Sequence, residues 1–318
     1  MPPLQPQLPI LRVKTPRFTH NALAFSPFFD DQIAVASGTN FGLIGNGRVN
    51  ILKFGQGGLR VVKTFDTQDC VYDVAWNETH ENQVIAACGN GSLRLFDTTL
   101  EGFPVKAWHE HRAEIMSVEW SNLLKDTFCT ASWDQTVKLW SIGRSTSLLT
   151  IPAHQAQIFQ ASFAPHVPSL IATCAADGCM NLFDTRSQIP DKPATSIRVS
   201  DGDVLHLDWN KYLPGIIATA SKDGVVRVWD TRNPGRPVAE LLGHRLAARK
   251  VAWSPHHRDI LATTSYDITC RTWSVTTRTE LLVHDQHTEF VMGAAWALFD
   301  RDVLATCAWD EEVHLFRT

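Results

Sequence analysis

The chain has 318 residues, of which 44% are hydrophobic and 19% are charged, and its formal net charge is −4. This composition is typical of a folded protein and argues against large-scale disorder. A slightly acidic chain has no general attraction to phosphate, so we expect no nucleic-acid partner.

The first segment is short and rich in proline, and we interpret residues 1–8 as a tail. It lacks the continuous apolar core of a signal peptide, and no run in the chain approaches the length that spans a membrane. The seven cysteines include no C-x-x-C pair and lie mostly in apolar runs, so they predict a reducing compartment rather than a disulfide framework. The segment Ile10–Lys14, "ILRVK", follows with the character of a strand.

Two aromatic positions then recur through the chain at intervals of 42 to 51 residues. One ends the first apolar run of each unit, and we call it the corner aromatic: Phe25, Trp76, Trp120, Phe163, Trp209, Trp253 and Trp296. The other closes the third run: Phe54, Phe96, Trp140, Phe183, Trp229, Trp273 and Phe316. Each unit has four strand-like runs separated by Gly, Asn, Asp or Pro, which is typical of a β-propeller blade.

The sequence therefore predicts an all-β fold, a single seven-bladed WD-repeat propeller over residues 9–318. The chain stops after the third strand of the seventh unit. We expect Ile10–Lys14 to supply the missing fourth strand, because this would join the two ends of the chain and remove an exposed edge.

A polar set repeats with the closing tryptophan. Where the closing residue is Phe, as at Phe96, the serine is absent, which indicates that serine accepts a hydrogen bond from the buried indole. A histidine nine residues before the corner aromatic completes the set in two blades. We predict a structural network of His111, Ser132, Asp134 and Trp140, of Ser221, Asp223 and Trp229, and of His244, Ser265, Asp267 and Trp273.

The same residue types could form a Ser-His-Asp catalytic triad. A triad occurs once in a domain and needs an oxyanion hole, whereas this set recurs in several blades, so we predict scaffold and no enzyme. Histidine-rich segments such as His109–His111 lack the ligand sets of metal sites, and we expect no metal and no cofactor.

The starts of the first strands and the turns before the repeated aspartates should meet on one face of the propeller. Large apolar residues and acids from several blades gather at those positions, and an apolar surface with charge of one sign marks an interaction site. Its complement is a short basic amphipathic helix. The predicted peptide-binding residues are Asp69, Tyr72, Glu114, Met116, Trp133, Phe159, Asp203, Leu205, Tyr266, Glu289, Met292 and Trp309. Blade one departs from the standard spacing, so we predict no residue there.

Several phrases are more specific than the repeat itself: "SWDQTVKLW" at 132–140, "PAHQAQI" at 152–158, "ELLGH" at 240–244, "VAWSPHHRDILATTSYD" at 251–267 and "QHTEF" at 286–290. With these phrases the whole chain resembles the receptors for type-2 peroxisomal targeting signals, a branch of the WD-repeat proteins.

The resemblance implies a cargo receptor of the cytosol that cycles to the peroxisome. Its partners would be matrix enzymes with an N-terminal signal of the pattern Arg/Lys-Leu, five residues, His/Gln-Leu/Ala, a co-receptor peroxin and the peroxisomal docking complex. Asp69 and Glu114 match positions where the family carries acids that face the basic residue of the signal. Two alternatives stay open: a WD-repeat scaffold of a chromatin or ubiquitin-ligase complex, and a propeller hydrolase.

Overall fold

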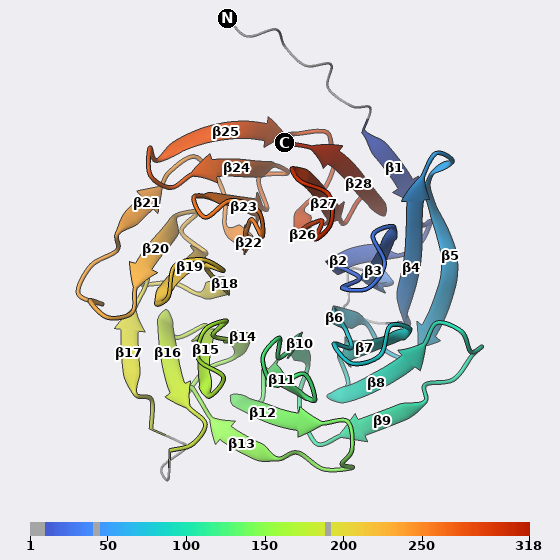
Figure 1. Cartoon of the computed structure of the whole chain (residues 1–318), viewed down its shortest axis with the longest axis horizontal. Coiled ribbons are helices and arrows are strands. Elements are labelled where there is room, and N and C mark those ends of the chain that lie inside the picture. Colours follow the sequence, from blue (N-terminus) through green and yellow to red (C-terminus); the bar gives the residue numbers. More distant parts are fainter. Residues whose placement is uncertain (1–9, 41–44, 188–191) are drawn as a thin grey trace, which may run out of the picture.

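The computed structural model describes residues 10–40, 45–187 and 192–318. Seven four-stranded antiparallel sheets surround a central axis, with the first strand of each sheet nearest the axis (Figure 1). This confirms the predicted seven-bladed propeller, while the predicted tail, residues 1–8, lies outside the described residues. In the described ranges, no helix is long and apolar enough to cross a membrane.

The strands of blades one to three are β2 Thr19–Phe25, β3 Gln32–Gly38, β4 Gly47–Gly55, β5 Gly58–Thr67, β6 Val71–Trp76, β7 Gln83–Cys88, β8 Ser92–Asp97, β9 Lys106–His109, β10 Ile115–Trp120, β11 Thr127–Ser132, β12 Thr136–Ser141 and β13 Leu149–Pro152. Those of blades four to six are β14 Ile158–Phe163, β15 Leu170–Ala175, β16 Cys179–Asp184, β17 Thr195–Arg198, β18 Val204–Trp209, β19 Ile216–Ser221, β20 Val226–Asp230, β21 Ala239–Leu241, β22 Ala248–Trp253, β23 Ile260–Ser265, β24 Cys270–Ser274 and β25 Thr279–His284. Blade seven contains β26 Val291–Trp296, β27 Val303–Ala308, β28 Glu312–Arg317 and β1 Leu11–Lys14.

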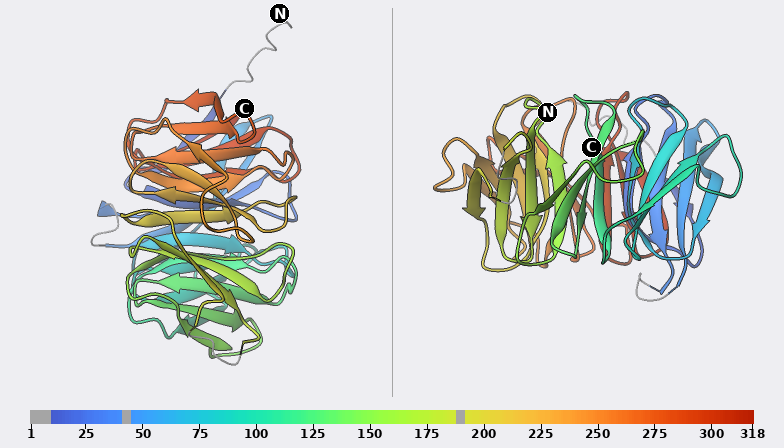
Figure 2. Two further views of the ribbon diagram at one scale, coloured as in Figure 1. Left: turned by 90° about the vertical axis from the view of Figure 1, so that its left-hand side faces the viewer. Right: turned by 90° about the horizontal axis from the view of Figure 1, so that it is seen from below.

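The strands run between two faces of a thick disc (Figure 2). We call the near face the side that carries the loops before the first strands and the turns between second and third strands. The far face carries the loops between first and second strands and those between third and fourth strands. Because all sheets have the same strand order, residues at equivalent positions of the repeat lie on the same face.

The ring closes as the sequence predicts. β1 pairs antiparallel with β28, with Leu11 opposite Leu315 and Lys14 opposite Glu312. The backbone N–H of Thr15 continues the pairing by donating to the carbonyl of Glu311 at 2.9 Å. The last blade therefore takes its outer strand from the opposite end of the chain, which covers the edge of β28.

The corner aromatics pack between neighbouring blades. Trp76 is 4% exposed, lies in one apolar cluster with β3 and β4 of blade one, and donates its indole N–H to the carbonyl of Ala24 at 3.0 Å. Trp296 makes the equivalent bond to Ala252 of blade six. Burial of a side chain of this size contributes about 1.5–3 kcal/mol, so these residues hold each blade against the one before it.

Carboxylates near the axis join blades in the same direction. Asp73 accepts the backbone N–H of Val118 in the next blade at 2.9 Å, and Glu119 accepts that of Phe163 at 2.9 Å. Asp208 accepts the N–H of Trp253 at 2.7 Å in the same way. Each bond satisfies a buried donor at a blade boundary, where an unpaired N–H would be costly.

The repeated polar network differs from the prediction in one member. The indole N–H of Trp140 donates to Thr130 at 2.9 Å, and His111 bridges that hydroxyl, at 2.7 Å, and the carboxylate of Asp134, at 2.8 Å. Serine as the indole acceptor is wrong: Ser132 lies one step further along the same side of the strand, where its Oγ accepts the N–H of Asp134 and donates to a backbone carbonyl. Ser132 makes no hydrogen bond to His111, so the geometry of a catalytic triad is not formed in this part of the described chain.

Burial by itself would raise the pKa of the Asp134 carboxyl, but the hydrogen bond and charge of His111 hold it below its usual range. Blade six repeats the whole arrangement with His244, Thr263, Asp267 and Trp273, and Ser265 again contacts the backbone. In blade five, Ser200 stands in place of the histidine and bonds to Asp223, Trp229 donates to Thr219, and Ser221 Oγ has no partner within the described residues.

Candidate functional site

The predicted peptide-binding residues all lie on the near face. Each acid comes just before a first strand, and each turn aromatic comes just after a second strand. A backbone hydrogen bond ties these two positions together in a blade: Trp133 N–H donates to the carbonyl of Glu114 at 3.0 Å, and Lys222 N–H to that of Asp203 at 2.9 Å. The carboxylates are therefore not distributed between opposite ends of the ring.

A β-bulge lies in the first strand of every blade, at the residue four positions before the corner aromatic. In blade two, for example, Val71 pairs with Cys88 and Asp73 with Ala87, so Tyr72 between them is the extra residue of the bulge. A bulge of this kind re-aims a side chain. Side chains from this position surround a narrow cavity on the axis: Asn21, Tyr72, Met116, Phe159, Arg249 and Met292.

Three predicted residues at the bulge position are more buried than expected. Met116, Leu205 and Met292 are only 6–8% exposed, so the prediction that they form an open apolar surface is wrong. Seven first strands converge on the axis, and the side chains at the bulges pack against one another there. Tyr72 and Phe159 at the same position remain half-buried.

The acids of blades two and three stand beside Tyr72. Burial raises the pKa of Tyr72, and the negative charges of Glu114 and Asp69 raise it further, so its hydroxyl is neutral at physiological pH. Asp69 Oδ1 accepts the backbone N–H of Cys70 at 2.9 Å. Neither Asp69 nor Glu114 forms an ion pair with a described lysine or arginine. The result is two half-buried carboxylates whose charge is not balanced.

Gly89, in the turn after β7, leaves room for this cluster. A Cβ at this position would lie 3.0 Å from Oδ1 of Asp69 and 3.2 Å from Cε2 of Tyr72. The close approach of Gly89 to the acid depends on the pairing of β6 with β7.

The acid of blade five behaves differently. Asp203 forms an ion pair with Lys222 of its own blade, at 3.3 Å between Oδ2 and Nζ. The turn residue next to Asp203 therefore supplies a balancing charge, which Asp69 and Glu114 lack among the described residues. Glu289 in blade seven is exposed and has no ion pair with a described residue.

Aromatic side chains form two groups on this face. Trp133 and Phe159 pack edge to face with ring centroids 6.2 Å apart, and Trp133 Nε1 is buried without a hydrogen-bond partner among the described residues. Across the ring, Phe290 lies between Tyr266, at 4.9 Å, and Trp309, at 5.4 Å. The sequence analysis missed Phe290, although it occupies in blade seven the position that Glu114 has in blade three.

Three histidines expected to bind no metal come together at the junction of blades six and seven. The nitrogens of His284, His287 and His314 lie within 4.8 Å of one another. His287 already contacts Asp310 and Thr306, and His284 Nε2 lies 2.9 Å from His314 Nδ1. A metal would have to replace these hydrogen bonds, and the rings of His287 and His314 are stacked 3.8 Å apart rather than pointing at one centre.

Comparison with known proteins adds the family. The model of the WD domain, G-beta repeat, matches residues 59–97, 102–141, 192–230 and 235–274. The peroxisomal targeting signal 2 receptor of Saccharomyces cerevisiae is 36% identical, over 95% of this chain and 97% of its own length. The receptor of Homo sapiens is 38% identical, over 88% of this chain and 87% of its own length.

The chain belongs to the family of peroxisomal targeting signal 2 receptors. Peroxisome biogenesis protein 7 of Arabidopsis thaliana is a further member, 37% identical over 94% of this chain and 95% of its own length. The resemblance inferred from the blade-specific phrases is confirmed. The four matched WD repeats fall within blades one to six, whereas the strand pairing of this chain forms seven blades.

Proposed function

We propose that this chain is a non-enzymatic cargo receptor whose near face binds the N-terminal type-2 peroxisomal targeting signal of matrix enzymes as a short basic helix. The observation that carries the proposal is the pair of unbalanced carboxylates, Asp69 and Glu114, next to half-buried Tyr72, in a chain of this family. A lysine or arginine of the signal would complete that pair with charge-assisted hydrogen bonds.

The rest of the helix would lie on the aromatic groups. Residues of the signal seven positions apart share one helix face, which brings its first pair and its last pair toward the same surface. Trp133 and Phe159 adjoin the acidic cluster, and Tyr266 with Trp309 faces them from the other side of the axis. Arg249, at the bulge position of blade six, adds a positive charge on the axis and would favour one orientation of the bound helix.

The energetics favour help from a second protein. A helix of nine residues is marginal alone in water, because nucleation is costly. One charge-assisted hydrogen bond contributes about 1.5–3 kcal/mol, and the ordering of the peptide offsets much of the gain from contacts. A co-receptor peroxin that covers the exposed side of the helix would raise the affinity, and would link the loaded receptor to the peroxisomal docking complex.

The receptor would then meet newly made enzymes in the cytosol and cycle to the peroxisome with them. The seven cysteines of the chain are all free thiols, and burial raises the pKa of Cys70 to about 12. A protein with buried, protonated thiols fits a reducing compartment.

The test is the binding of a fluorescent peptide of the pattern Arg-Leu, five residues, His-Leu, in the presence of the co-receptor, followed by anisotropy. We expect the double variant Asp69→Ala with Glu114→Ala to bind at least about tenfold more weakly than the wild type, because it loses both acceptors of the basic residue.

The matched control is Asp203→Ala, whose carboxylate is already paired with Lys222 and should change the affinity little. A peptide with glutamine in place of its arginine should bind the wild type and the double variant equally. Unchanged affinity of the double variant for the arginine peptide would remove the proposed site.

A further inference from the structure

Exposed apolar side chains gather on the face opposite to the proposed signal site. Four of the seven loops that join first to second strands expose large apolar residues of 43–55% accessibility, those of blades one, three, five and seven: Phe28, Leu123, Leu124, Tyr212, Leu298 and Phe299. Of the loops on the near face, within the described residues, only the one before β22 exposes comparable side chains, Leu242 and Leu246. Exposed apolar side chains around the mouth of a channel are typical of an interaction site.

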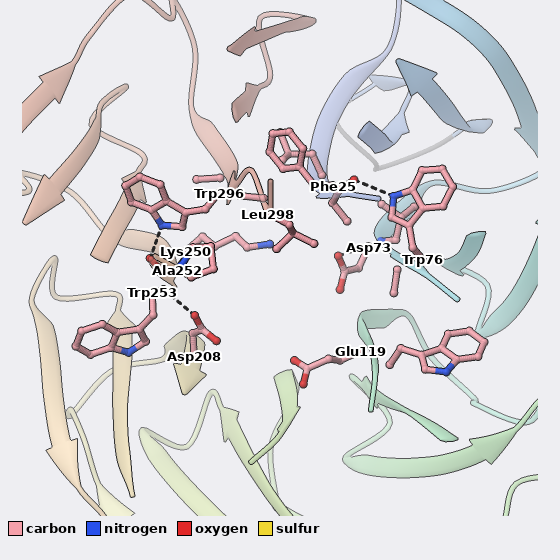
Figure 3. A pocket seen from close by; sticks show the side chains of 18 of the residues that line it. Phe25, Asp73, Trp76, Glu119, Asp208, Lys250, Ala252, Trp253, Trp296 and Leu298 are labelled. Atoms are coloured by element: carbon pink, nitrogen blue, oxygen red, sulfur yellow. Dashed lines mark hydrogen bonds between the residues drawn. The ribbon is translucent and has the colours of Figure 1, made fainter. Parts of the chain in front are cut away.

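These loops surround a cavity of about 310 Å³ at the far mouth of the central channel. Its wall includes Pro27 and Leu298 from the loops and Trp253 from a first strand. Figure 3 shows Leu298 and the aliphatic chain of Lys250 over the opening, with the carboxylates of Asp73 and Glu119 directed at the axis.

The wall of the cavity carries an excess of negative charge. Four acids line it from three blades, Asp73, Glu78, Glu119 and Asp208, against two lysines in the same wall, Lys211 and Lys250. Glu78 is paired with Lys125 outside the wall, at 2.9 Å. Lys211 is bound to Asp208 at 2.6 Å. One further positive charge would balance the group.

Two polar groups in this wall have unused capacity. Glu119 Oε1 accepts hydrogen bonds from Ser162 and Phe163, whereas Oε2 accepts none from a described residue, and burial raises the pKa of Glu119 to about 7. His206 is 8% exposed, lines the cavity, and its buried Nδ1 has no hydrogen-bond partner in the described chain. Burial and the nearby Lys250 lower the pKa of His206, so its ring is neutral. Glu119 Oε2 therefore suits a hydrogen-bond donor that enters the cavity from solvent.

The charge of the loops points the same way. The segments 26–31, 77–82, 121–126, 164–169, 210–215, 254–259 and 297–302 contain eight Asp and Glu against four Lys and Arg. The loops between third and fourth strands, on the same face, contain six Lys and Arg against two Asp and Glu, so the surplus of negative charge is confined to the loops next to the axis. It favours a basic side chain at the mouth itself.

The far face of blades five to seven is held rigid by bonds between loops. Asn210 Nδ2 donates to the carbonyl of Arg258 at 2.8 Å, and Tyr212 Oη to that of Pro255 at 2.6 Å. His256 Nε2 donates to the carbonyl of Ala297 at 2.9 Å. A surface ordered before binding loses little entropy when a partner docks.

We propose that the far mouth is a second docking surface, which binds a protein segment with apolar side chains around one lysine or arginine that enters the cavity. The apolar side chains rest on Tyr212, Leu298 and Phe299, and the cation reaches Glu119. The surface is separate from the proposed signal site, and the inference does not depend on that function.

The test begins with a phage library of random peptides of about twelve residues, selected on the immobilised full chain. The variant Leu298→Asp with Phe299→Asp serves to remove peptides that bind elsewhere. We expect enriched peptides to combine apolar residues with a lysine or arginine, and to bind this variant about tenfold more weakly by anisotropy. Glu119→Gln keeps the Oε1 acceptor and removes the charge, and should weaken binding about threefold or more.

Two controls separate this surface from the signal site. Asp69→Ala with Glu114→Ala, and Leu242→Asp on the near face, should bind the selected peptides like the wild type. Conversely, Leu298→Asp with Phe299→Asp should retain binding of the type-2 signal peptide and an unchanged melting temperature. Absence of any enriched peptide, an acidic consensus, or equal affinity for wild type and Leu298→Asp with Phe299→Asp would overturn the proposal.

Discussion

The two mouths of the channel are built from the same seven strands but differ in what they present. At the near mouth the bulges turn side chains such as Tyr72 and Phe159 toward the axis and nearly close it. At the far mouth the same strands leave a cavity of about 310 Å³, with exposed Leu298 and Phe299 beside it.

This difference follows from strand register. The bulge adds one residue to the first strand near its start, so large side chains crowd the near end of the axis. Beyond the bulge, regular pairing leaves smaller residues, such as Ala24 and Ala252, facing the far end. One fold thereby provides an acidic, aromatic rim on one face and an apolar, open mouth on the other, and each can be altered separately.

The largest expected effect is a loss of stability of the whole fold at acid pH, which would affect both faces. It comes from buried histidines where blade one meets blades six and seven. Burial lowers the pKa of His20 to about 4, of His314 to about 4 and of His284 to about 3. The unfolded chain binds protons on these rings below pH ~6.5, and the folded chain does not. The free energy of unfolding should therefore keep its full value above pH ~6.5 and decrease as the pH drops toward 4. His20 alone should lower it by about 2 kcal/mol at pH 5.

Urea unfolding followed by tryptophan fluorescence at pH 7.5, 6 and 5 measures this slope. The charged groups near the cluster are Arg12, Asp310 and Glu312. We expect His284→Gln to flatten the dependence on pH, and His80→Gln, which changes an exposed ring, to leave it as in the wild type. Equal stability at pH 7.5 and 5 would contradict the prediction.

A second change should affect the near face alone. Gly89→Ala places a methyl group 3.0 Å from the Asp69 carboxylate and 3.2 Å from the Tyr72 ring, and both must shift. We expect the signal peptide to bind about three- to tenfold more weakly, because a displaced carboxylate makes poorer hydrogen bonds. Anisotropy titration measures it.

Gly57→Ala is the matched control, since a Cβ there meets no atom within 4 Å. Peptides selected for the far mouth should bind Gly89→Ala and the wild type equally. If Gly89→Ala binds the signal peptide with full affinity, Asp69 and Tyr72 do not hold the peptide in their present positions.

The smallest expected effect sharpens the charge pattern of the near face. Lys222→Ala removes the partner of Asp203 and leaves a third unbalanced acid on that face. We expect the cationic signal peptide to bind about twofold more tightly at low salt, with the gain lost at high salt, because exposed charges are screened. Titrations at two ionic strengths test this, and equal affinity at low salt would show that Asp203 lies too far from the bound helix to contribute.

The repeat could be recognised in the sequence because two aromatic positions recur in each blade even where the other residues differ. Corner residues such as Trp76 must fill the gap between blades, so their spacing reports the blade directly. Closure by the segment Leu11–Lys14 was readable for a similar reason, since one strand was missing at one end of the chain and one was spare at the other.

The sequence predicted on which face the candidate site lies, but not the contacts of its individual residues. Thr130 and Ser132 lie on the same side of the strand, two residues apart, so the sequence does not tell which of them accepts the indole N–H. The position of the Trp140 ring in the fold selects Thr130. The balance of Asp203 by Lys222 was also missed, although both residues stood in the sequence. Their contact depends on the hydrogen bond between the turn and the strand entry.

The sequence by itself determined the number of blades, the closure of the ring and the face on which the acids gather, because these follow from periodicity. Only the tertiary structure decided which side chains are free to bind. The bulges bury Met116, Leu205 and Met292, and the convergence of seven strands creates the far cavity. Register and convergence arise from pairing between strands, which no single segment encodes.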